Sequence, residues 1–218
     1  NPETRQPIYY LASVRYVPPA IDVIAGEVLQ SLRSALDHLA YQLVQVGTGQ
    51  PGPFSYVYFP IFDSAQEYES GKMRKIKGMR QEAIDAIDAI KPYKGGNDTL
   101  WQLDHLNIVD KHRLLVTVGS KLGAVDVGQV LMRGWAPAFP EKSDFSLFLA
   151  PADSLFPLKA GDVLFTDLPD AEPNEDQKFS FDIAISEPGI IEGEPLVETL
   201  HQMVDLVDHL VPIFRPLL

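Results

Sequence analysis

The chain has 218 residues, 45% hydrophobic and 22% charged, values typical of a soluble globular protein with a sizeable core. It holds no cysteine, which excludes disulfides, zinc–thiolate sites and cysteine nucleophiles, and no apolar run approaches the roughly 18 residues that a membrane helix needs. The formal net charge of −12, from 30 acidic and 18 basic residues, disfavours broad electrostatic attraction to nucleic acid or to an anionic membrane.

The N-terminal half is predicted to be mainly helical. The chain opens at Asn1 with neither an initiator Met nor an apolar signal segment, so we expect it to begin inside a longer, cytoplasmic protein. Alternating apolar residues predict a strand over 8–17. Helical spacing and capping signals then predict, in chain order, a helix over 21–46, an extended segment over 54–62, a short helix after Ser64, and helices over 73–90 and 99–113.

The second half changes character. Short apolar runs separated by Pro and Gly predict strands at 114–118, 125–132, 145–149, 163–166 and 178–185. An apolar stripe at a spacing of about 3.6 residues predicts a last helix within 194–216. We therefore expect one α+β domain over 1–218, with a helical part (18–113), an antiparallel β meander (114–190) and a C-terminal helix that packs back on the helices.

One tripeptide recurs in the predicted helices. Asp-His-Leu occurs at 37–39, 104–106 and 208–210, and with His112 and His201 these copies hold all five histidines. Histidine is the side chain best suited to proton transfer and metal ligation near neutral pH. Its concentration in three helical segments indicates a functional site.

The first helix places Asp37, His38 and Tyr41 away from its leucine face, with Arg33 on the margin of that polar side. Arg33 and Asp37 are four residues apart, so they are able to pair along the helix. One interpretation is a solvated face with a single ion pair. The other is a ligand-facing surface, because a Tyr and a His share the polar side.

Arg33, followed by His38 after four residues, resembles the Arg-x4-6-His motif of HEPN domains (higher eukaryotes and prokaryotes nucleotide-binding). The resemblance implies a metal-independent endoribonuclease whose Arg holds a phosphate and whose His transfers a proton, across a cleft between two protomers. Residues 32–43 and 100–115 also resemble segments of an uncharacterised bacterial family, a likeness that implies no activity.

The predicted helix over 99–113 carries His105 and ends in Lys111, His112 and Arg113. Three basic residues in a last turn favour the negative end of a helix, which is one interpretation. In the other, they join Arg33 around an anionic ligand.

A metal site has weaker support. On the last helix, Asp205 lies one turn from each of His201 and His209, so a pair of them could ligate an ion. No HExxH or comparable motif is present, and we predict no cofactor and favour no metal.

Three functions remain open. The first is a HEPN-like endoribonuclease or RNA-binding protein, with Arg33 and His38 as catalytic residues and the Asp37, Tyr41, His105 and 111–113 side chains in support. The second is a non-enzymatic ligand- or protein-interaction domain with structural Asp-His pairs. The third is a metal-dependent hydrolase. We expect RNA or another anionic ligand as partner, a homodimer, and no membrane association.

Overall fold

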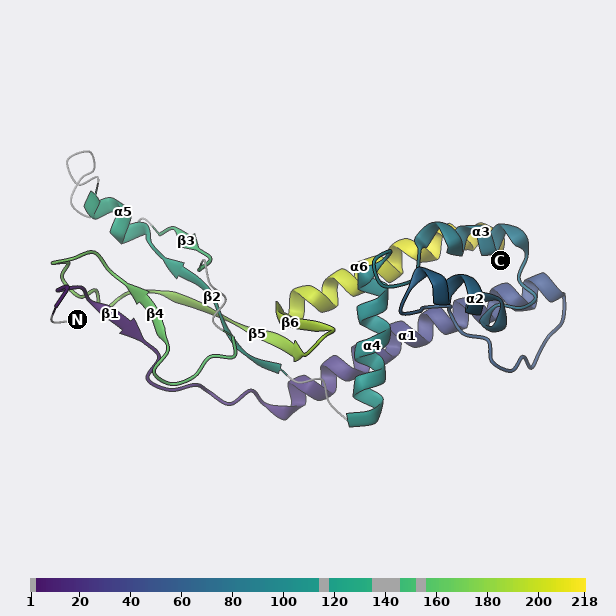
Figure 1. The fold of residues 1–218 in the computed structure, drawn as a ribbon, viewed down its shortest axis with the longest axis horizontal. Coiled ribbons are helices and arrows are strands. Elements are labelled where there is room, and N and C mark those ends of the chain that lie inside the picture. Colours follow the sequence, from purple (N-terminus) through teal and green to yellow (C-terminus); the bar gives the residue numbers. More distant parts are fainter. Residues whose placement is uncertain (1–2, 114–117, 135–145, 152–155) are drawn as a thin grey trace. The chain divides into compact units, whose positions relative to one another are not determined.

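A computed structural model describes residues 3–113, 118–134, 146–151 and 156–218, and it has the predicted α+β fold (Figure 1). The chain divides into two compact units. The β unit comprises residues 1–18, 118–186 and 192–196, and the helical unit comprises 19–117, 187–191 and 197–218. Each unit has its own buried residues.

The helical unit is built from five α-helices and a short 3₁₀ turn within the described residues. They are α1 (Pro19–Thr48), α2 (Ala65–Lys75), α3 (Gln81–Ile90), α4 (Asp98–Arg113), α6 (Leu196–Phe214) and η2 (Arg215–Leu217). The C-terminal helix packs on the earlier helices, as predicted. Phe214 near its end meets Phe59 edge-on, with ring centroids 6.4 Å apart and both side chains fully buried.

The longest helix, α1, buries the leucines that the sequence spaces at helical intervals. Leu29, Leu36 and Leu43 are at most 2% exposed, and burying each side chain contributes about 2 kcal/mol. The helix ends at Thr48 because Gly49 follows with a φ of +66°, a conformation that side chains with a Cβ disfavour.

The predicted helix over 73–90 is wrong: two helices, α2 and α3, share that range. Ser64 caps α2 through its hydroxyl, which accepts the Glu67 amide at 3.2 Å. The chain then turns at Gly78, whose φ is +100°. That conformation interrupts the helix, although the apolar spacing continues across it.

The described residues of the β unit form two sheets. In the smaller, β1 (Ile8–Tyr10) pairs antiparallel with β4 (Val163–Thr166). The larger has the order β3-β2-β5-β6 and comprises β3 (Phe148–Leu149), β2 (Val118–Asp126), β5 (Phe179–Glu187) and β6 (Ile191–Pro195). The strands are antiparallel, as expected, but β4 leaves the predicted consecutive order to pair with β1.

Two predicted strands need correction. The strand over 8–17 ends at Tyr10, and the strand over 125–132 is replaced by the end of β2 and by α5 (Gly128–Gly134). The Asp126 carboxylate accepts the Gly128 amide at 2.9 Å and so favours the start of that helix. The strand predicted at 114–118 falls, except for Val118, outside the described residues.

Within the described ranges, no helix has both the length and the apolar character required to cross a bilayer.

Candidate functional site

A buried arginine connects two of the Asp-His-Leu segments. Arg33 of α1 is 7% exposed, and its guanidinium donates to Asp37 of the same helix and, through Nε at 2.6 Å, to Asp104 of α4. Its Nη2 donates to the Phe59 carbonyl at 3.1 Å. Two carboxylates and a carbonyl thus surround one cation. Such charge-assisted hydrogen bonds are stronger than neutral ones.

These contacts fasten the extended segment 59–63, named here the strap, to the two helices. The amide of Phe59 donates to Asp37 at 2.9 Å, while the Phe59 carbonyl accepts from Arg33. At the other end of the strap, Asp63 accepts Trp101 Nε1 at 2.8 Å and lies 2.9 Å from His105 Nε2. The polar residues of α1 and α4 therefore position the strap from both ends.

The histidine of the second copy is already engaged. His105 Nδ1 lies 3.0 Å from the Trp101 carbonyl, and the two rings stack with centroids 4.3 Å apart. Both ring nitrogens face oxygen atoms, one of a carbonyl and one of Asp63. His105 therefore stabilises the junction between α4 and the strap.

The two residues of the HEPN-like motif lie in different environments. Arg33 is buried and has an acceptor at three of its nitrogens, whereas His38 is exposed on α1. The Arg33 guanidinium is thus committed to the strap. Tyr41 lies one turn beyond Asp37, and its ring contacts Phe54 at 5.5 Å between centroids.

The end of α4 does not join Arg33. Lys111 and His112 are exposed, and the side chain of Arg113 lies outside the described part. Arg33 meets α4 at Asp104, two turns earlier. The basic residues at 111–113 are therefore separated from the buried arginine along the helix.

The alternative metal ligands on α6 are exposed: His201, Asp205 and His209 all face solvent. His209 Nδ1 lies 2.5 Å from the Asp205 carbonyl, a contact within the helix. Among the described residues, no three His, Cys, Asp or Glu side chains come together as a metal site would require.

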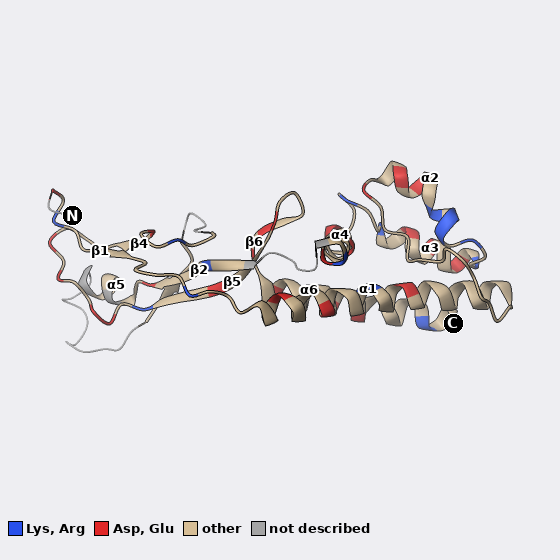
Figure 2. Cartoon of the chain, turned by 90° about the horizontal axis from the view of Figure 1, so that it is seen from below, with Lys and Arg blue, Asp and Glu red and all other residues tan. Residues whose placement is uncertain are grey.

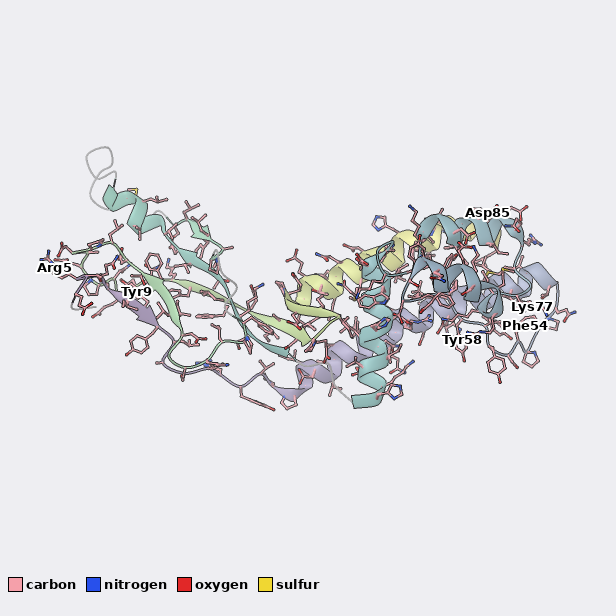
Figure 3. All side chains as sticks on the ribbon, viewed as in Figure 1. Arg5, Tyr9, Phe54, Tyr58, Lys77 and Asp85 are labelled. Atoms are coloured by element: carbon pink, nitrogen blue, oxygen red, sulfur yellow. The ribbon has the colours of Figure 1, made fainter. Side chains whose placement is uncertain are left out.

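A cleft of about 670 Å³ opens beside the strap, between the loop that precedes it and the end of α2. Its lining combines three cations with three aromatic rings: Pro53, Phe54, Ser55, Tyr56, Val57, Tyr58, Arg74, Lys75 and Lys77. Figure 3 labels Phe54, Tyr58 and Lys77 at the same end of the helical unit, and the blue end of α2 stands out in Figure 2. We name this feature the basic–aromatic cleft.

The cleft has charge and ring surface available for a ligand. Tyr56 is 78% and Tyr58 is 47% exposed. Arg74 and Lys77 are exposed, and neither forms an ion pair with a described residue. Exposed aromatic side chains next to unpaired cations are typical of a binding surface rather than of a packed core.

Lys75 points inward instead. Its Nζ donates to the Ile61 carbonyl at 3.1 Å and lies 4.3 Å from the centre of the Phe62 ring. Burial lowers the pKa of the Lys75 amine, the nearby Asp104 carboxylate opposes this shift, and the positive Arg33 adds to it. The Lys75 carbonyl accepts the Tyr58 amide at 3.3 Å, so α2 holds the loop directly.

Sequence reasoning missed the cleft. The signal was the run Arg74-Lys75-Ile76-Lys77, which is unusually basic for a chain with a net charge of −12. It also missed Asp104 as the second partner of Arg33 and Asp63 as the partner of His105. Both pairs join residues far apart in the chain, at separations of 71 and 42 positions, which spacing within a helix does not reveal.

Comparison with known proteins yields no relative: no protein-family model, no curated sequence and no solved structure matches this chain.

Proposed function

We propose that this protein binds a nucleotide-like anion, with single-stranded RNA as the fitting polymer, in the basic–aromatic cleft. The observation that carries the proposal is one cavity of about 670 Å³ with two exposed tyrosines and two exposed cations that pair with no carboxylate of the described residues. The proposal keeps the RNA binding of the first function but assigns it to residues other than Arg33 and His38, in a ligand-binding domain such as the second function describes.

The chemistry of the cleft suits such a ligand. Arg74 is able to bind a phosphate through a forked pair of hydrogen bonds, and Lys77 adds a second positive charge. The rings of Phe54, Tyr56 and Tyr58 offer faces on which bases stack, an interaction worth about 1–3 kcal/mol per base. Because the rest of the chain is strongly acidic, this local site would restrict binding to one surface.

The test is fluorescence anisotropy with a labelled oligo-uridylate at several salt concentrations. Each phosphate that a cation neutralises on a single strand contributes about 0.7 to the slope of log affinity against log salt. The variant Arg74→Gln/Lys77→Gln should therefore lower that slope by about 1.4. Tyr58→Ala should weaken binding about tenfold at constant slope.

The matched control is Arg5→Gln/Lys159→Gln, which removes two exposed cations from the β unit. It should leave affinity and slope close to those of the unaltered protein. If it weakens binding as much as the cleft variant does, attraction is nonspecific and the proposal fails. Absence of any binding at low salt would equally contradict it.

A second candidate is RNA cleavage by His38. His38 is exposed on α1, three residues before Tyr41, whose ring contacts Phe54 in the wall of the cleft. An imidazole beside a bound strand would be able to transfer the 2′-hydroxyl proton without a metal. In this proposal Arg33 holds the strap beside the cleft instead of contacting phosphate.

Cleavage is tested by incubating labelled RNA with the protein in the presence of EDTA. His38→Ala should abolish cleavage and leave oligo-uridylate binding unchanged. Cleavage that persists in His38→Ala, or that EDTA stops, would reject His38 as the proton-transfer group. Sedimentation of the unaltered protein would report whether it forms the homodimer that the HEPN resemblance implies.

A further inference from the structure

A second cavity, separate from the basic–aromatic cleft, lies in the β unit. It lies against the face of the larger sheet on which Leu158 packs, named here the inner face. Leu122 of β2 pairs with Phe181 of β5, so both side chains project from the same face. Leu122 is fully buried, covered by Leu158, whereas Phe181 is 47% exposed. The residues that pack on the inner face therefore leave the Phe181 side chain partly uncovered.

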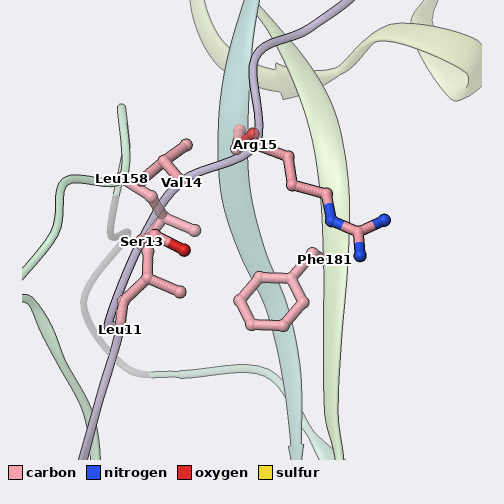
Figure 4. A pocket seen from close by; sticks show the side chains of 7 residues that line it. Leu11, Ser13, Val14, Arg15, Leu158 and Phe181 are labelled. Carbon is pink, nitrogen blue, oxygen red and sulfur yellow. The ribbon is translucent and has the colours of Figure 1, made fainter.

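The segment that follows β1 borders this opening. Leu11 packs on the core, fixed by hydrogen bonds to the Asp162 carbonyl and from the Gly161 amide, and the chain continues beside the sheet. Between this segment and the sheet lies a cavity of about 280 Å³ (Figure 4). Its lining is mainly apolar, with two hydroxyls and one cation: Leu11, Ser13, Val14, Arg15, Ser120, Leu158 and Phe181.

Among the described residues of that lining, Arg15 alone is charged. It is exposed, forms no ion pair with a described residue, and extends past the ring of Phe181 (Figure 4). A guanidinium presents a rigid fork of donors that matches a carboxylate. An apolar cavity with one cation therefore favours an amphipathic anion over a neutral hydrocarbon or an amine.

We propose that this cavity binds a small monocarboxylate with an apolar body, such as a medium-chain fatty acid. The apolar tail lies against Leu11, Leu158 and Phe181, and the carboxylate pairs with Arg15. The volume is just below the range of about 300–1,000 Å³ for drug-sized ligands, so the ligand is small. The site is independent of the basic–aromatic cleft, because its residues belong to the β unit.

Isothermal titration calorimetry with octanoate on the full chain tests the proposal, with octanol and octylamine as matched probes. Octanoate should bind at least about tenfold more tightly than either, because octanol and octylamine lack the negative charge that pairs with Arg15. Arg15→Gln should remove this preference. Arg5→Gln, an exposed arginine elsewhere in the unit, should preserve it.

A second variant tests whether filling the cavity prevents octanoate binding. Ser120→Leu adds side-chain volume on the inner face of β2 and should abolish octanoate binding, while circular dichroism and thermal melting report whether the fold is kept. Two results would overturn the proposal. One is octanoate binding that is unchanged both in folded Ser120→Leu and in Arg15→Gln, and the other is no octanoate binding at millimolar concentration. Equal binding of octanol would also overturn it, leaving only a nonspecific apolar cavity.

Discussion

Removing the charge of Arg33 should destabilise the helical unit strongly. In Arg33→Met the side chain keeps most of its volume, but Asp37 and Asp104 lose their common counter-ion. These carboxylates are 29% and 15% exposed, and Phe59 loses the donor to its carbonyl. Breaking a buried ion pair from one side costs about 3–5 kcal/mol. Because water reaches Asp37, we expect the lower end, about 3 kcal/mol.

Urea denaturation and thermal melting measure this loss. For a chain of this size, about 3 kcal/mol corresponds to a melting temperature lower by about 10 °C. The triple variant Arg33→Met/Asp37→Asn/Asp104→Asn should recover at least half of the loss, since no unpaired charge then remains. Arg80→Met is the control, because Arg80 is exposed and makes a single long hydrogen bond of 3.4 Å to Val46.

Two results would refute this reasoning. One is a cost for Arg33→Met below about 1 kcal/mol, the value of an exposed ion pair. The other is a triple variant no more stable than the single one, which would mean that unpaired carboxylates are not the cause. Oligo-uridylate binding by folded Arg33→Met should weaken, because the strap positions the adjoining loop of the cleft.

Three further variants test local features of the helical unit. Burial raises the pKa of Asp110, so its ionised form opposes folding at neutral pH. Asp110→Asn should therefore raise the free energy of unfolding at pH 7, with the gain disappearing as the pH falls below 3.8, where the carboxyl is protonated in both states. Gly26→Ala should cost about 1–3 kcal/mol in urea denaturation, because a Cβ there would meet the Asp110 carboxylate. Ser64→Ala should lower the free energy of unfolding by about 1 kcal/mol, because the α2 cap is lost. A change near zero would show that Ser64 does not stabilise the start of α2.

The helices were predictable wherever local signals agreed with packing. Leucine spacing located α1, and the ends of α4 were predicted within a residue or two. The break at Gly78 was not, because apolar spacing continues through the turn and conceals it. The helix α5 was missed for a similar reason: a short apolar run does not separate helix from strand, and the capping role of Asp126 depends on local geometry.

The candidate site could be predicted only in part. Spacing along one helix suggested the pair of Arg33 with Asp37, which the structure contains. The spacing of residues within one helix could not show that Arg33 also pairs with Asp104, or that Arg33 is buried. Both depend on how α1 packs against α4. The leucine of each Asp-His-Leu copy is buried, whereas His105 is half-buried and His38 and His209 are exposed.

The most direct test of the central proposal is a map of amide chemical shifts during titration with oligo-uridylate. The amide signals of residues 54–58 and 74–77 should shift together and saturate, while those of the β unit stay unchanged. Shifts confined to other surfaces, or none at millimolar ligand, would contradict the basic–aromatic cleft as the binding site.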